Sequence, residues 1–122
     1  MSGFYEKETI RNLRRLRQLK PELFRSFTEF SKLVFSDSAL PAKMKELMAI
    51  TAAHVTQCPW CIDEHVKRAK ARGASDEEIA EAVYVAMAMR AGGAWSHGAI
   101  AMASAEGEDS QAHPQTAEQN RR

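Results

Sequence analysis

The sequence predicts an all-α protein, a compact bundle of about five or six helices. Apolar residues recur at spacings of three and four along most of the chain, as on one face of a helix. Proline or serine stands at several positions where a helix would begin. No stretch has the strict alternation of apolar and polar residues that marks a half-buried strand.

Two helices are expected in the first third of the chain. The apolar positions of residues 6–20 repeat every three residues, at Ile10, Leu13, Leu16 and Leu19. The four arginines between them are interpreted as a solvated face rather than as a site for an anionic partner. Pro21 favours a new helix start, and the apolar and aromatic stripe that follows to about Phe35 is typical of a core.

A third helix should run from Pro41 to about Gln57. Between Leu47 and Val55 it carries no formal charge, His54 excepted if it is protonated. A helix that is apolar on nearly every side is usually surrounded by other helices or by subunits. At 100° per residue, Glu46 lies at the edge of the main apolar face, which comprises Met44, Leu47, Met48, Thr51 and Val55.

A fourth helix, about residues 59–72, should end at Gly73, a good residue for a helix C-terminus. Ser75 and Glu78 have the spacing of a capping box, which predicts the start of a fifth helix. This box is followed by a continuous apolar periodicity, with Ile79 as its first member.

The fifth helix is expected to stop at Arg90, because Gly92-Gly93 should interrupt it. A sixth segment, Ala94 to Ala105, is rich in small residues that permit close approach between helices or subunits. Residues 1–106 are therefore assigned to a single all-α domain. The polar residues 107–122 have no apolar periodicity and are predicted to form a flexible tail.

The composition disfavours several classes of function. The 122 residues carry a net charge of +1, which gives no argument for nucleic acid or a membrane surface as a partner. No apolar run approaches the roughly 20 residues of a spanning helix, and the N-terminus has no signal-peptide core. A cytoplasmic location is expected, where a CxxC pair is more often catalytic or metal-binding than structural.

Both cysteines belong to one short motif, Cys58-Pro59-Trp60-Cys61, with His65 four residues further on. Pro59 favours the first position of a helix and extended geometry for the residue before it, so Cys58 should be the N-cap. Cys58, Cys61 and His65 then share one stripe of that helix. The positive end of the helix dipole stabilises a thiolate, which indicates a dithiol suited to redox chemistry.

His65 could take the proton of Cys61 or stabilise its thiolate as an imidazolium. A carboxylate would orient this histidine, and the candidates are Glu46, Asp63 and Glu64. Cys61 would attack a peroxide or a disulfide, after which Cys58 would close the Cys58–Cys61 bond. A partner dithiol would reduce that bond, and no cofactor is expected.

Two other interpretations of the motif stay open. A zinc site could combine Cys58, Cys61 and His65 with a fourth ligand from Glu46, His54 or His97, although the second ligand pair of a structural zinc site is missing. The thiols could also be a passive buried pair. His54 and His97 are more simply core or interface histidines. Trp60 and Trp95 are most simply packing residues, although Trp60 could line the mouth of a site.

The sequence resembles the alkylhydroperoxidase D / carboxymuconolactone decarboxylase family over roughly residues 20–105. The resemblance rests on Glu46, the CxxC motif that follows after eleven intervening residues, His65, and the Gly92-Gly93-Ala94-Trp95-Ser96-His97 segment. It implies an all-α fold, assembly into trimers or hexamers, and thiol peroxidase activity. It assigns Cys61 as the peroxidatic cysteine, Cys58 as the resolving one, and Glu46 and His65 as a proton relay.

This chain departs from alkylhydroperoxidase D at Trp60, which replaces a histidine, and in being a short, single-unit member. The decarboxylases of the family typically lack CxxC, which argues against that activity. Spacing alone does not bring Glu46 to His65, because Glu46 lies about 18 Å before Cys58 along a straight helix. Its role in the relay rests on the resemblance.

The function expected is therefore an antioxidant thiol peroxidase, with a general thiol-disulfide oxidoreductase as the alternative in the same chemical class. A non-enzymatic zinc-binding or redox-sensing protein is the alternative from another class. The expected partners are a hydroperoxide substrate, a lipoylated or thioredoxin-like dithiol reductant, and further copies of the chain in a homotrimer or homohexamer. Neither nucleic acid nor a membrane is expected.

Overall fold

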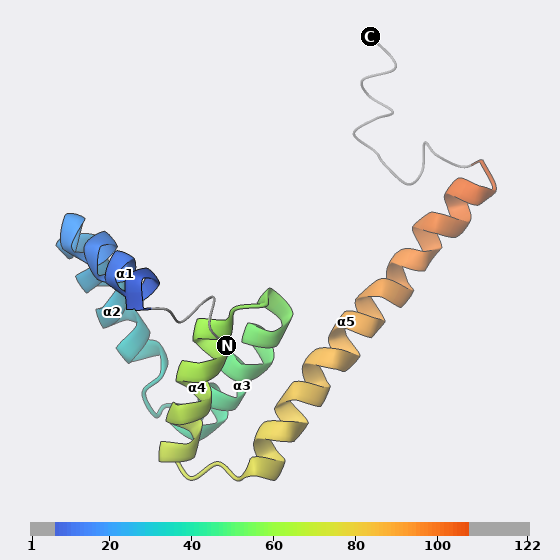
Figure 1. Cartoon of the computed structure of the whole chain (residues 1–122). Coiled ribbons are helices and arrows are strands. Elements are labelled where there is room, and N and C mark those ends of the chain that lie inside the picture. The colour runs from blue at the N-terminus through green and yellow to red at the C-terminus, as the bar shows by residue number, and fades with distance from the viewer. Residues whose placement is uncertain (1–6, 108–122) are drawn as a thin grey trace. The chain divides into compact units, whose positions relative to one another are not determined.

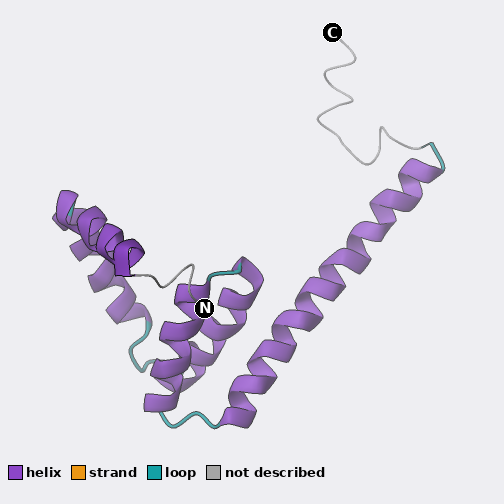
Figure 2. Cartoon of the chain, viewed as in Figure 1, coloured by secondary structure: helices purple, strands orange, loops and turns teal. Residues whose placement is uncertain are grey.

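The computed structural model describes residues 7–107, which form five α-helices and no strand (Figure 2). Figure 1 shows them in chain order: α1 (Lys7–Leu19), α2 (Pro21–Val34), α3 (Ala42–Thr56), α4 (Pro59–Ala71) and α5 (Asp76–Ala105). The predicted all-α fold class is confirmed. The first four helices begin and end within one residue of their predicted bounds.

The predicted break at Gly92-Gly93 is wrong, because α5 continues through both glycines as one helix of 30 residues. A glycine inside a helix costs about 1 kcal/mol relative to alanine, but it keeps its N–H and has no ring to clash with the preceding turn. Strong helix formers flank the pair on both sides, among them Arg90, Ala91 and Ala94. Two glycines in this setting weaken the helix without ending it.

The chain divides into two compact units, and the boundary between Val83 and Tyr84 lies within α5. The assignment of residues 1–106 to a single domain stays a prediction. The predicted tail, residues 107–122, lies outside the described residues from residue 108 onward. Within the range that the structure describes, no helix has both the length and the apolar character needed to cross a membrane.

The core of the first unit lies where α3 and α4 pack side by side and meet the start of α5 (Figure 1). Its buried members are mostly alanines, which let the helix backbones approach closely. They are Ile50, Ala69, Ala74 and Ala82, with Leu47, Val66, Ile79 and Val83 packed against them. Thr51 ties α3 to α5 by donating its hydroxyl to the carbonyl of Ala82 at 2.9 Å.

The inward face of α3 is the edge that carries Glu46, together with Ala42, Ile50 and Ala53. Within this chain, the larger apolar face predicted from the sequence is partly left uncovered, and Met44 and Met48 are 46% and 54% exposed. Hydrophobic periodicity reports only that a face is apolar. It does not report which neighbour covers that face.

A tight reversal connects α3 to α4. Gln57 adopts the left-handed conformation, with φ 59°, and its N–H donates to the carbonyl of Ala53. The Cys58 N–H donates to the same carbonyl at 3.0 Å. Since Pro59 already begins α4, the chain reverses over two residues and lays α4 back along α3.

The predicted capping box at the start of α5 is confirmed. The Ser75 N–H donates to Glu78 Oε1, and the Glu78 N–H donates to Ser75 Oγ, both at 3.0 Å. Lys43 Nζ, in the first turn of α3, lies 2.9 Å from Glu78 Oε2. The Ser75 N–H foremost, and Lys43 in addition, lower the pKa of Glu78 from the usual 4.5.

Glu78→Gln should therefore make stability less dependent on pH in the acid range. The pKa of Glu78 is lower in the folded than in the unfolded chain, so its carboxylate stabilises the fold fully above pH 4.5 and progressively less as the pH falls through the folded value. Urea unfolding should find the variant less stable than the wild type at pH 7, with a difference in unfolding free energy that shrinks as the pH falls below 4.5. Glu81→Gln, a change at an exposed position on α5, is the control and should track the wild type. A constant difference between Glu78→Gln and wild type at all pH values would contradict this account.

Candidate redox-active site

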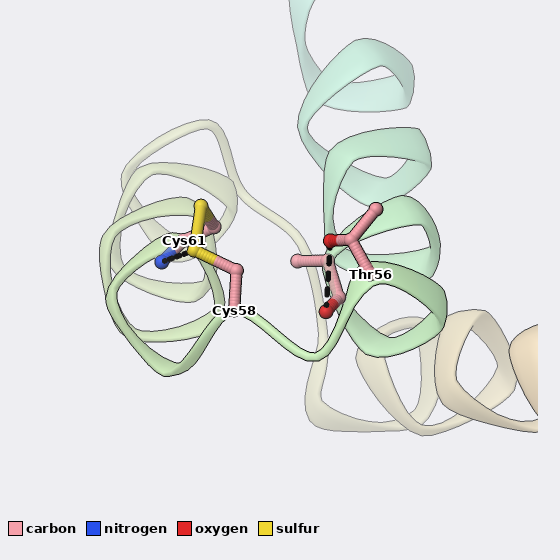
Figure 3. The surroundings of a disulfide bond; sticks show 4 residues. Thr56, Cys58 and Cys61 are labelled. Carbon is pink, nitrogen blue, oxygen red and sulfur yellow. Dashed lines mark hydrogen bonds between the residues drawn. A yellow bond between two sulfur atoms is a disulfide. The ribbon is translucent and has the colours of Figure 1, made fainter.

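Cys58 and Cys61 form a disulfide at the start of α4 (Figure 3). Cys58 is the N-cap, as predicted, with φ −108° and ψ 97°, and Pro59 occupies the first turn. The Cys61 N–H points back at Cys58 Sγ, 3.3 Å away, in the manner of a side-chain N-cap (Figure 3). The helix start thus places a backbone donor and its positive dipole end at the sulfur pair.

The disulfide is within reach of small reactants, because both cysteines are only partly buried. When the bond is reduced, the N–H that now meets Cys58 Sγ can stabilise negative charge on that sulfur. Just before the site, at the end of α3, Thr56 donates its hydroxyl to the Ala53 carbonyl at 3.4 Å (Figure 3).

His65 lies one turn after Cys61 on the same stripe of α4, and it meets Glu46 of α3. The distance from His65 Nδ1 to Glu46 Oε2 is 2.6 Å, and the two side chains are 14% and 5% exposed. A buried carboxylate needs a partner, and the reversal at Gln57 supplies one that is 19 residues away in sequence. With Nδ1 engaged by Glu46, Nε2 is the ring nitrogen left to exchange a proton.

The other two candidate carboxylates do not serve this histidine. Asp63 and Glu64 are exposed and bind cations one turn further along α4, Lys67 and Arg68 respectively. Of the three acids considered from the sequence, Glu46 is therefore the one that the fold brings to His65. Its part in a proton relay stays a prediction.

One residue of the site was not singled out from the sequence. Phe35, just after α2, stacks on His65 with ring centroids 5.0 Å apart and an angle of 29° between the planes. In the sequence Phe35 is simply the last member of an aromatic stripe. No spacing relates it to His65, since the contact depends on how the loop between α2 and α3 folds.

Two further histidines of the described part of the chain contact carbonyls of their own helices. His54 Nδ1 lies 2.8 Å from the Ile50 carbonyl, and His97 Nδ1 lies 2.8 Å from the Gly93 carbonyl. Among the residues described, no group of three or more His, Cys, Asp or Glu side chains is arranged to hold a metal ion. Trp60 is half-buried within the CxxC motif.

Comparison with known proteins places the chain in a family. A sequence profile described as "Carboxymuconolactone decarboxylase family" matches residues 21–118. Uncharacterised protein 4 in the cox locus of Paracoccus denitrificans is 53% identical over 78 residues, covering 64% of this chain and 70% of that protein.

Solved structures agree with the profile. A carboxymuconolactone decarboxylase family protein from Legionella pneumophila, solved in its apo form, superposes with a TM-score of 0.62 at 34% identity and covers 68% of this chain and 74% of that one. A family protein from Thermotoga maritima, with a suggested part in the antioxidative response, gives a TM-score of 0.50 at 40% identity, covering 52% and 65%. The profile spans well over half of the sequence, and these structures have the same helical fold. This chain belongs to the carboxymuconolactone decarboxylase family.

Proposed function

We propose that the protein is a thiol peroxidase that reduces hydroperoxides through Cys61 and Cys58. The observation that carries the proposal is the buried Glu46–His65 pair: His65 lies on the stripe of α4 that begins with the disulfide, and Glu46 reaches it from α3. A carboxylate that orients a histidine beside a nucleophile is a recurring arrangement in catalysis. The suggested role of the Thermotoga maritima family protein in the antioxidative response also supports a peroxidase function.

The first step is attack by the Cys61 thiolate on the terminal oxygen of a hydroperoxide. His65 takes the thiol proton through Nε2, while Glu46 holds Nδ1 and stabilises the imidazolium. The O–O bond breaks and the leaving alkoxide takes the proton from His65, giving an alcohol. Cys61 becomes a sulfenic acid, oxidised by two electrons.

The second step closes the disulfide seen in the structure. The Cys58 thiolate attacks Cys61 sulfur and expels hydroxide, which leaves as water after protonation. An external dithiol, lipoylated or thioredoxin-like, then reduces Cys58–Cys61 by thiol–disulfide exchange and is itself oxidised to a disulfide. A general thiol-disulfide oxidoreductase would use only this last exchange, so peroxide consumption distinguishes the two functions.

Substitution of the cysteines should separate the two steps. Cys61→Ser should abolish peroxide consumption, because the attacking sulfur is gone. Cys58→Ser should consume about one equivalent of peroxide and then stop, because the sulfenic acid has no partner to resolve it. Peroxide loss and dimedone labelling, followed by mass spectrometry, measure both outcomes.

The controls are the wild type with a panel of reductants: a lipoylated protein, a thioredoxin-like protein and a small thiol. Sustained turnover with one of the dithiols supports the peroxidase cycle. Thiols of the reduced wild type that stay unreacted with peroxide over minutes would rule it out.

Glu46→Gln should lower the rate of Cys61 oxidation by about ten- to a hundredfold, because the amide keeps the shape of the carboxylate but removes the charge that holds the imidazolium. Stopped-flow oxidation of the reduced protein measures this rate. Glu64→Gln is the matched control, since its exposed carboxylate binds Arg68 on the outside of α4. Equal rates in Glu46→Gln and wild type would remove Glu46 from the mechanism.

We also propose that the protein works as a homotrimer or homohexamer. A groove of about 620 Å³ between α1 and α2 is lined mostly by apolar side chains, among them Leu13, Leu16 and Phe27, and also by Arg14, Arg17 and Lys20. In the second unit, Trp95 of α5 is 84% exposed. Monomeric proteins rarely leave apolar patches of this extent uncovered, and further copies of the chain would cover them.

Light scattering should find three or six copies of the 13.6-kDa chain in the wild type. Leu16→Glu and Trp95→Glu should each shift the mass toward the monomer, because a charge would be buried at a subunit contact. Arg15→Glu adds the same carboxylate to α1 at a position that does not line the groove, and should leave the mass unchanged. A wild type that runs as a monomer at all concentrations would contradict the proposal.

A further inference from the structure

Two contacts hold the His65 ring, and they restrain different motions. The hydrogen bond to Glu46 restrains one distance, from Nδ1 to the carboxylate at 2.6 Å, whereas two side-chain torsions, χ1 and χ2, set where the ring lies. The χ2 torsion of histidine is broad and sets the ring plane only weakly. The Phe35 ring covers one face of the imidazole at a centroid distance of 5.0 Å, within the range of offset-stacked aromatic pairs. This second contact restrains the plane.

The plane matters because the Nε2 lone pair lies in it. A combined change of χ1 and χ2 could turn Nε2 away from Cys61 while Nδ1 stayed within reach of Glu46. Proton transfer requires a donor and acceptor in line and within hydrogen-bond reach. A group that restrains the plane of the imidazole therefore also restrains the direction in which Nε2 points.

Phe35 is itself held in place from two sides. Its N–H donates to the Ser31 carbonyl at 3.0 Å, which ties it to the end of α2. The next residue is anchored to α3, since Lys45 Nζ donates to the Ser36 carbonyl at 2.7 Å. Asp37 Oδ1 accepts the Ala42 N–H at 2.7 Å, at the start of the same helix. The turn of α3 that carries Glu46 thus also anchors the loop that carries Phe35.

Phe27 and Phe30, which lie within α2, are not in this position. Phe27 and Phe30 are 64% and 65% exposed, whereas Phe35 is partly buried and is the ring that stacks on His65. We propose that Phe35 is a positioning residue that sets the orientation of His65 toward Cys61. The proposal rests on the proposed function in one respect, namely that His65 exchanges a proton with Cys61.

The test uses the reduced full chain and needs no peroxide. The rate of alkylation of Cys61 by iodoacetamide is measured against pH in Phe35→Ala, Phe35→Leu and Phe35→Tyr. The ¹⁵N and ¹³C NMR signals of the His65 ring are recorded for the same proteins. Phe30→Ala is the matched control, because it removes an exposed ring from α2, the helix that Phe35 directly follows. Urea unfolding verifies that each variant is folded.

Phe35→Ala and Phe35→Leu should slow alkylation about three- to tenfold, change its pH profile and alter the His65 signals. Phe35→Tyr should keep the wild-type alkylation rate, pH profile and His65 signals, because it keeps the planar ring. Phe30→Ala should change none of the three. Phe35→Leu preserves apolar volume without a ring, so it carries the test if Phe35→Ala does not fold.

The proposal is overturned if Phe35→Leu leaves the His65 signals and the alkylation profile as in the wild type, since filling space would then suffice. His65→Gln distinguishes this failure from that of the proposed function. If His65→Gln does not change the alkylation profile, then His65 exchanges no proton with Cys61. That result would exclude both the proton relay and the positioning role of Phe35. If His65→Gln does change it while Phe35→Leu does not, the relay stands and Phe35 alone is excluded.

Discussion

The hydrogen bond between Glu46 and His65 depends on how α3, α4 and the reversal between them are arranged in the first unit. It joins α3 to α4 across 19 residues of sequence, and it exists only if α4 folds back along α3 in one register. The reversal needs a left-handed residue at Gln57 and an immediate helix start at Pro59. Close approach of the two helices needs small side chains, which Ala53 and Ala69 provide. Because an unpartnered buried carboxylate is costly, this one contact also selects the register.

The inward position of Glu46 also explains which apolar surfaces of α3 stay exposed. Since α3 turns its Glu46 edge inward, Met44 and Met48 on its other face stay exposed within the chain. The alanine-rich core of the first unit is small, and most of the larger apolar side chains of α1 and α2 stay exposed. The protein therefore concentrates its internal packing around the site. The larger apolar side chains remain available for the contacts between copies of the chain that we propose.

Local signals in the sequence predicted local structure well. Proline before a helix and the Ser75/Glu78 spacing predicted helix starts, and the N-cap role of Cys58 followed from Pro59. The break predicted at Gly92-Gly93 was wrong because glycine weakens a helix but does not block it. Long-range contacts were beyond such signals: the Glu46 contact came from a family resemblance, and the Phe35 contact depends on a loop whose path no periodicity encodes.

The backbone of Cys58 belongs to two helices at once. Its N–H closes the last turn of α3 on the Ala53 carbonyl, and its own carbonyl accepts the Ile62 N–H to open α4, each at 3.0 Å. Its side chain is meanwhile half of the disulfide. Strain or movement at this sulfur is therefore shared by the ends of both helices without any intervening loop to absorb it. We therefore expect the hydrogen-exchange rates of the Cys58 and Ile62 amides to change when the disulfide is reduced.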